Sequence, residues 1–147
     1  MKKVYDLASF TTAIFILVVT ILMIGPGLAG ATEECRLVKI TGTRSPNVSV
    51  RIEPETVSIS KGDCVVWINW TRAVAIKVLF REGKKCEAAS QAPVGFKMDA
   101  PTGCYTTGVI PLGATSSLMF VEEGTFDYQV EADGTTGRGR IVVKNKK

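Results

Sequence analysis

The sequence contains no histidine among its 147 residues. Histidine is the commonest general base in enzymes and the commonest protein ligand for copper, zinc and haem iron. Its absence excludes nucleophilic catalysis by Ser-His-Asp or Cys-His sets, and it excludes every metal site built on imidazole. The chemistry of this chain must therefore rest on other side chains.

Clustered positive charge is also missing. Eighteen Lys and Arg residues stand against 14 Asp and Glu residues, for a formal net charge of +4, and Lys2 and Lys3 at the N-terminus account for two of the positive charges. The other basic residues are scattered among acidic ones, whereas nucleic-acid binding requires a basic face. We therefore expect no nucleic-acid partner.

Motifs for catalysis are absent as well. The sequence has no paired carboxylates, no nucleophile with an adjacent base and no phosphate loop. Asp127, Glu131 and Asp133 crowd one segment, but acidic side chains in a loop are usually only solvated. We predict that the chain is not an enzyme and carries no cofactor.

The N-terminal segment is strongly apolar. No charged residue occurs between Leu7 and Ala31, and Ala29-Gly30-Ala31 has the small-x-small form of a signal-peptidase site. Residues 1–31 are therefore interpreted as a signal peptide. An uncleaved anchor is the alternative, because the apolar run approaches the roughly 20 residues that a spanning helix needs.

Both interpretations place the rest of the chain outside the cytoplasm. The two N-terminal lysines stay on the cytoplasmic side, and residues 32–147 form one domain in the periplasm or an equivalent extracytoplasmic space. Contact with the membrane is expected only through the N-terminal segment, if that segment is not removed.

Four cysteines lie in the exported part: Cys35, Cys64, Cys86 and Cys104. An even number of cysteines in an oxidising compartment indicates disulfide bonds, here two, and three pairings are open. Cys86 and Cys104 stand near the two ends of a long stretch, Arg81–Gly103, that is rich in turn residues. A disulfide between them would fasten this stretch, so it is the preferred pair.

Short alternating apolar runs separated by turn residues follow the N-terminal segment. Such runs predict β-strands, and seven or eight of them without a long amphipathic helix predict an all-β sandwich. The expected strands are residues 36–41, 48–60 with an interruption at residues 53–55, 64–69, 73–80, 104–107, 115–120, 125–130 and 138–143, with residues 131–137 as a loop.

The order of these runs resembles the cupredoxins, the plastocyanin-like family. The matching segments are Ile52-Glu53-Pro54-Glu55-Thr56-Val57, Gly62-Asp63-Cys64-Val65-Val66-Trp67-Ile68-Asn69, Pro111-Leu112-Gly113-Ala114-Thr115, Gly124-Thr125-Phe126-Asp127-Tyr128 and Gly137-Arg138-Gly139-Arg140-Ile141-Val142-Val143. The resemblance implies a Greek-key β-sandwich. It also implies that the first and third strands run side by side and parallel, which makes Cys35 and Cys64 the second disulfide pair.

The resemblance places the family's copper ligands at positions that hold other residues. Its first histidine corresponds to Ile76, its cysteine to Val130, its second histidine to Asp133 and its axial methionine to Arg138. Blue copper requires two imidazoles and a thiolate. The sequence therefore predicts a divergent, metal-free member, with Ile76 and Val130 filling the former ligand pocket and with Asp133 and Arg138 either ion-paired or facing solvent.

The end of the sandwich that carries ligands in this family is the expected docking surface. Candidate contact residues there are Trp70, Val74, Val109, Ile110, Pro111 and Leu112. The alternative is that they cap the core, in which case replacing Trp70 would unfold the domain. The preferred function is an exported, non-catalytic binding or structural module with a protein partner in the cell envelope. The alternative is a cupredoxin-type electron carrier with an atypical metal site.

Overall fold

A computed structural model describes residues 34–43, 49–72, 74–83 and 90–146. These residues belong to the second of two units of the chain, Glu33–Lys147. The predicted signal peptide or anchor, residues 1–31, lies outside the described residues. Within them, no helix has the length and apolar character required to cross a membrane.

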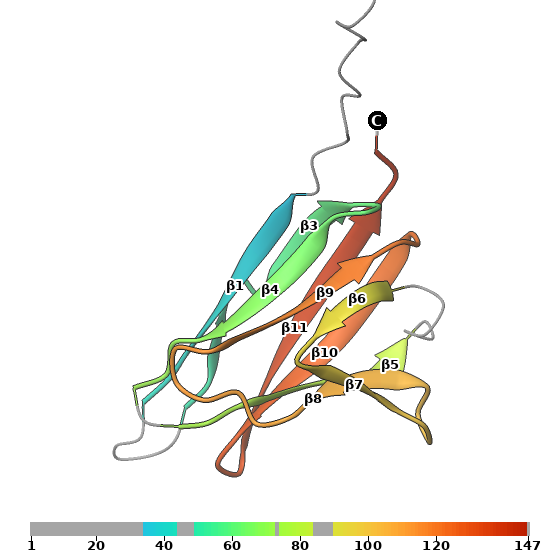
Figure 1. The fold of residues 1–147 in the computed structure, drawn as a ribbon. Coiled ribbons are helices and arrows are strands. Elements are labelled where there is room, and N and C mark those ends of the chain that lie inside the picture. Colours follow the sequence, from blue (N-terminus) through green and yellow to red (C-terminus); the bar gives the residue numbers. More distant parts are fainter. Residues whose placement is uncertain (1–33, 44–48, 73, 84–89, 147) are drawn as a thin grey trace, which may run out of the picture. The chain divides into compact units, whose positions relative to one another are not determined.

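The described residues form a sandwich of two β-sheets (Figure 1). One sheet has the strand order β2-β1-β4-β9-β6 and the other has the order β3-β11-β10-β5-β8-β7. The strands are β1 (Cys35–Thr41), β2 (Arg51–Glu53), β3 (Thr56–Ser60), β4 (Cys64–Asn69), β5 (Lys77–Gly83), β6 (Ser90–Val94), β7 (Phe96–Asp99), β8 (Cys104–Thr107), β9 (Thr115–Phe120), β10 (Gly124–Ala132) and β11 (Thr135–Lys144). The predicted all-β sandwich is confirmed.

Alternating residues explain why these segments become strands. In β10 the side chains of Phe126, Tyr128 and Val130 are buried, while those between them are not. A period of two places one set of side chains against the opposite sheet and the other set outside. The same alternation in β3 and β9 gives each sheet one apolar inner face.

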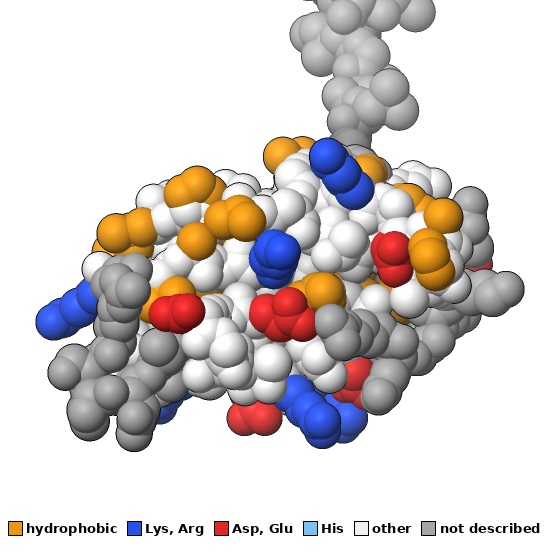
Figure 2. Space-filling model, turned by 90° about the horizontal axis from the view of Figure 1, so that it is seen from below, with side chains coloured by type: hydrophobic (Ala, Val, Ile, Leu, Met, Phe, Trp, Pro, Cys, Tyr) orange, Lys and Arg blue, Asp and Glu red, His pale blue; other side chains and the backbone are white. Residues whose placement is uncertain are grey.

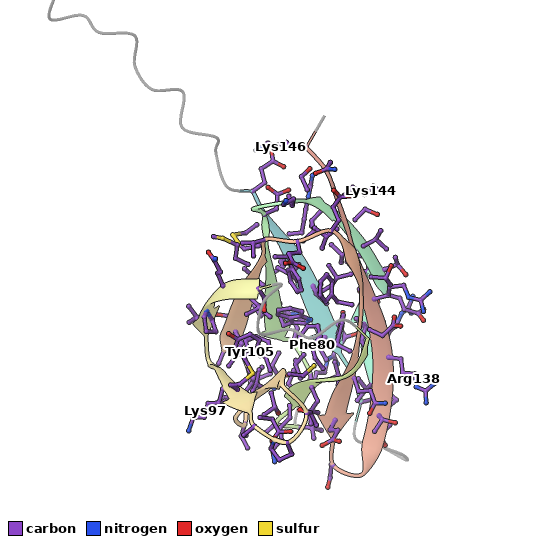
Figure 3. The ribbon with its side chains drawn as sticks, turned by 90° about the vertical axis from the view of Figure 1, so that its right-hand side faces the viewer. Phe80, Lys97, Tyr105, Arg138, Lys144 and Lys146 are labelled. Carbon is purple, nitrogen blue, oxygen red and sulfur yellow. A yellow bond between two sulfur atoms is a disulfide. The ribbon has the colours of Figure 1, made fainter. Side chains whose placement is uncertain are left out.

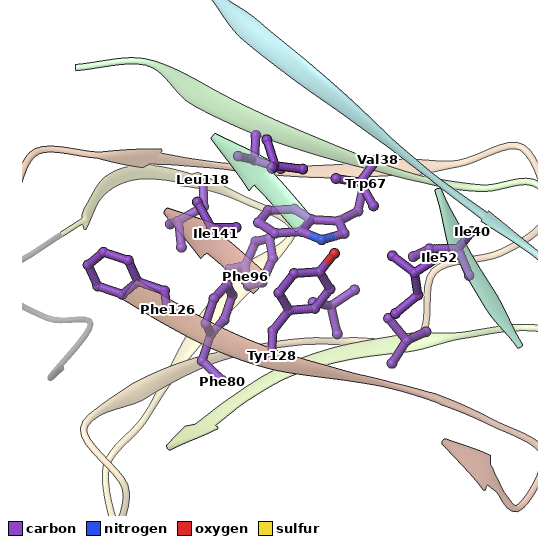
Figure 4. Close-up of a cluster of buried hydrophobic side chains, with 14 of the residues drawn as sticks. Val38, Ile40, Ile52, Trp67, Phe80, Phe96, Leu118, Phe126, Tyr128 and Ile141 are labelled. Carbon is purple, nitrogen blue, oxygen red and sulfur yellow. The ribbon is translucent and has the colours of Figure 1, made fainter. Parts of the chain in front are cut away.

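Aromatic side chains fill the centre of the core (Figure 4). The ring of Trp67 on β4 lies between rings from the facing sheet, with centroid distances of 5.9 Å to Phe80, 5.3 Å to Phe96 and 5.5 Å to Tyr128. All three contacts are edge-to-face, the geometry that the ring quadrupoles favour. Trp67 therefore packs one sheet against the other at the centre of the core.

Gly139 on β11 makes room for one of these rings. It is the cross-strand partner of Tyr128, and a methyl group at this position would overlap the tyrosine ring. Both glycines of the Gly-Arg-Gly-Arg segment at residues 137–140 are thus required by packing: the missing side chain of Gly139 leaves room for the tyrosine ring, and that of Gly137 leaves room for Val50 and Ile52.

The two predicted disulfides have different outcomes. Cys35 and Cys64 are bonded and are directly paired in the parallel ladder of β1 and β4, as predicted. Cys86 lies outside the described residues, and Cys104 is buried at the start of β8. The Cys86–Cys104 pair therefore stays a prediction.

Two segments differ from the sequence expectation. The stretch 81–103 contains strands β6 and β7, which add an edge to each sheet. Residues 131–137, expected as a loop, belong mostly to strands, because β10 continues to Ala132 and β11 begins at Thr135. The pair Asp133-Gly134 alone forms the turn, and both residues have positive φ, 42° and 81°. An Asp-Gly pair in this conformation makes the tightest type of β-hairpin.

Candidate functional site

The candidate site is the end of the sandwich that Figure 2 shows from below. We call it the loop pole. It is built from the residues that follow β4, the residues between β8 and β9, and the β10–β11 turn. Each segment leaves a different strand of the core, so the positions of the strands fix where the loops meet.

A buried asparagine holds two of these loops together. The Asn69 side chain donates hydrogen bonds of 2.9 Å each to the carbonyl oxygens of Val74 and Ile110. Its Oδ1 accepts a bond from the backbone N–H of Thr71 at 3.0 Å and lies 2.8 Å from the Thr71 hydroxyl. Every donor and acceptor of the amide is used. The loop after β4 and the loop before β9 are therefore joined through one side chain.

The first two positions at which the resemblance places copper ligands belong to the hydrophobic core. Ile76 and Val130 are both buried, Ile76 forms an isolated bridge with Ile110, and Val130 pairs with Val78 in the ladder of β5 and β10. Aliphatic side chains donate no electron pair to a metal. The pole is therefore continuous with the apolar core at these two positions.

The other two positions at which the resemblance places copper ligands are exposed and apart from each other in the hairpin. Asp133 is in the turn, whereas Arg138 lies on β11 opposite Gln129. Figure 3 shows Arg138 pointing away from the sandwich. Within the described residues, no ion pair joins Asp133 to Arg138. Of the two predicted alternatives, the structure therefore has the one in which both side chains face solvent.

These four residues do not fit the copper centre of a cupredoxin. They offer one carboxylate and no imidazole, thiolate or thioether. A two-residue turn also replaces the loop on which the resemblance would place a second histidine and an axial methionine. The donor set is therefore wrong for blue copper both in chemistry and in the segment that would carry it.

The predicted docking residues divide into buried and exposed ones. Ile110 is buried and Val74 packs partly buried against the core. Trp70 and Leu112 are 55% and 59% exposed. The Gly113 N–H donates to the Asn69 carbonyl at 2.8 Å, so the backbones of the residues next to them, Leu112 and Trp70, belong to neighbouring parts of the two loops.

We call Trp70, Leu112 and the equally exposed Val109 the apolar patch. The ammonium group of Lys39 lies over the Trp70 ring, 5.3 Å from the ring centroid. A cation over an indole face is attracted to it. The patch combines large apolar groups with a positive charge at its edge. Such a composition is typical of anchors in protein interfaces.

A shallow pocket adjoins Val109 at the same pole. Ala75, Ile76 and Lys77 line one side of it, and residues 131–136 of the hairpin line the other. Its charged rim consists of Lys77, Glu131 and Asp133. Sequence reasoning missed this pocket because it depends on the tight turn, for which Asp133-Gly134 was the available signal.

Comparison with known proteins supports the fold. No family model matches the sequence, and no curated protein sequence is similar enough to count as a relative. Among solved structures, a reduced tryptophan-to-tyrosine mutant of amicyanin matches with a TM-score of 0.50 and 20% sequence identity, over 79% of this chain and 88% of that chain. The reduced Cu(I) form of a proline-to-glycine mutant of amicyanin matches with a TM-score of 0.48 and 21% sequence identity, again over 79% of this chain and 88% of that chain. The described part of the chain has the fold of a cupredoxin.

Proposed function

We propose that this protein is a metal-free binding module of the cell envelope that docks a protein partner through the apolar patch. The observation that carries the proposal is the exposure of Trp70 and Leu112 on loops that the Asn69 hydrogen bonds hold in place. A preorganised aromatic anchor loses little conformational entropy when a partner covers it. Exposed apolar side chains gathered in one place are a recurrent mark of interaction sites.

The extracytoplasmic location rests on two features. Residues 7–31 are uncharged and preceded by two lysines, as in export signals. The Cys35–Cys64 disulfide is a bond that persists in oxidising compartments and is rare in the cytosol.

Copper binding tests the metal-free part of the proposal. The exported protein is incubated with Cu(II) and with Cu(I), passed through a desalting column and assayed for bound metal and for a visible charge-transfer band. The expected result is no stoichiometric copper and no blue colour. Tight one-to-one copper that cycles between two redox states would favour the alternative, an electron carrier.

Capture from envelope extract tests the docking part. The wild-type protein and its Trp70→Ala and Leu112→Ala variants are used as baits after chemical cross-linking. Met98→Ala, which shortens an exposed apolar side chain on β7, is the matched control. We expect one cross-linked partner that the control retains and both patch variants lose.

Stability separates docking from a role in the core. Because more than half of the Trp70 side chain is exposed, its replacement by Ala should leave the domain folded, with a loss of about 1 kcal/mol or less. Equal capture by all four baits would refute the docking surface. Unfolding of Trp70→Ala would assign the residue to the core instead.

A further inference from the structure

The outer faces of the two sheets differ in charge. On the sheet that contains β10 and β11, the outward positions include Asp127, Gln129, Glu131, Arg138 and Arg140. Arg140 donates to both oxygens of Asp127, at 2.6 and 3.3 Å. This face has the polar character that is usual for a solvated sheet surface.

The outer face of the sheet β2-β1-β4-β9-β6 has a row of small and apolar residues. Leu37 pairs with Val66, Val66 pairs with Ser117, and Ser117 pairs with Val94, so four adjacent strands contribute one residue each. Their inward neighbours, such as Val38, Val65 and Ser116, are buried, which leaves this row outside. Leu37 and Val94 at its two ends are 56% and 61% exposed.

The two neighbouring rows of outward residues are also mostly uncharged. On one side, the Cys35–Cys64 disulfide is followed by Met119 and Gln91. On the other side, Lys39 is followed by Ile68 and Thr115. Lys39 is the charged residue that β1, β4, β9 and β6 contribute to the three rows, and its cross-strand partner on the edge strand β2 is the oppositely charged Glu53. We call the apolar members Leu37, Val66, Ile68, Val94 and Met119 the sheet stripe.

The two sheets of the sandwich thus differ in the chemistry of their outer faces.

We infer that the sheet stripe is the interface of a homodimer, with a second copy of this chain as its occupant. Two copies can meet there without placing like charges opposite each other, although each carries a formal net charge of +4. The charged side chains beside the stripe have partners of opposite charge within one chain: Glu53 pairs with Arg51 at 2.9 Å and is the cross-strand partner of Lys39. A surface of this kind is complementary to itself, as the isologous contact of a two-fold dimer requires.

The size of the face sets the strength of the dimer. The face consists of four strands about 4.8 Å apart, each about six residues long with a rise of about 3.3 Å per residue. It therefore has an area of roughly 400 Å² in each copy. The pair would then bury about 800 Å², which is below the roughly 1,200–2,000 Å² of stable complexes. The dimer is therefore weak, reversible and dependent on concentration.

Sedimentation equilibrium of the exported chain tests the dimer between about 10 μM and 1 mM. We expect the wild-type protein to shift reversibly from monomer to dimer over this range. The double variant Leu37→Lys/Val94→Lys, changed at two well-exposed positions, should keep its thermal midpoint and remain monomeric throughout. Monomeric wild-type protein at every concentration would overturn the inference.

A second double variant controls for added charge. Ser58→Lys/Thr136→Lys places the same two charges on the outer face of the other sheet, where both side chains are exposed, and should dimerise as the wild type does. Equal loss in the two double variants would assign the effect to net charge, and equal retention would place the contact elsewhere. Trp70→Ala should still dimerise; if it alone becomes monomeric, the contact lies at the apolar patch and the inference is wrong.

Discussion

Gly139 and Tyr128 are cross-strand partners in close contact at the core. The tyrosine ring occupies the space that a side chain at residue 139 would need, and the ring is fixed on its other side by Trp67. Neither neighbour can move without disturbing the contact between the two sheets. Overpacking of such a site usually costs more than one methyl group gains by burial.

We predict that Gly139→Ala lowers the free energy of unfolding by about 1–3 kcal/mol. Urea unfolding measures the change, and Gly108→Ala is the control, because a methyl group there would meet no atom within 4 Å. In a Tyr128→Leu background the penalty of Gly139→Ala should shrink. Equal effects of the two glycine substitutions would contradict the packing role.

Tyr128 also carries a buried hydroxyl group without a hydrogen bond. Its oxygen and the indole N–H of Trp67 point toward each other in Figure 4, yet neither has a partner with hydrogen-bond geometry. Burial raises the pKa of Tyr128 to about 12; the nearby indole N–H offsets part of this rise, and the charge of Glu55 adds a little to it. The folded state therefore favours the protonated phenol.

The direction of this pKa shift predicts alkaline sensitivity. Because the folded pKa lies above the unfolded value of 10, the stabilisation is complete below pH 10 and is lost as the pH rises toward 12. The loss amounts to about 2–3 kcal/mol. Unfolding curves of wild type and Tyr128→Phe, recorded from pH 8 to the alkaline limit, should converge at pH 8 and separate above about pH 10.

Tyr128→Phe should be neutral or slightly stabilising at neutral pH, because it removes a buried polar group that has no partner. Parallel loss of stability in both proteins at high pH would assign the sensitivity to other groups.

At the scale of elements, Asn69 connects the end of β4 with two loops of the pole. Removing its amide leaves the carbonyl groups of Val74 and Ile110 and the N–H of Thr71 without their partners. Each buried polar group without a hydrogen-bond partner lowers the free energy of unfolding, because water cannot replace the lost bond. The position of Trp70, the next residue, depends on the same contacts.

We predict that Asn69→Ala lowers the free energy of unfolding by about 2–4 kcal/mol. Asn145→Ala, at an exposed site near the C-terminus, should change it by less than about 0.5 kcal/mol. Trp70 fluorescence should also become more heterogeneous in Asn69→Ala, in a Trp67→Phe background that leaves one tryptophan. An unchanged stability would mean that the two loops are held by other contacts.

For the whole molecule, the sandwich separates three kinds of surface. One sheet faces water with ion pairs such as Asp127–Arg140, the other presents the sheet stripe, and the loop pole presents the apolar patch. The exposed ion pairs contribute little to stability. Their main effect is to keep this face of the sandwich hydrated.

The sequence alone was sufficient for the fold and for part of the site. Alternating apolar residues determine strands and inner faces wherever they occur, so Val57 and Ile59 could be assigned to the core from their spacing. The missing histidines and the residues at positions 76 and 130 exclude blue copper in any conformation.

Only the tertiary structure decided which apolar residues are available to a partner. Trp70 and Ile110 both follow strands and look alike in the sequence, but the hydrogen bonds of Asn69 turn one outward and draw the other into the core. The sheet stripe likewise joins Leu37, Val66 and Val94 from three strands. Such surfaces depend on register between distant segments, and register is fixed by the packing of the whole sandwich rather than by local sequence.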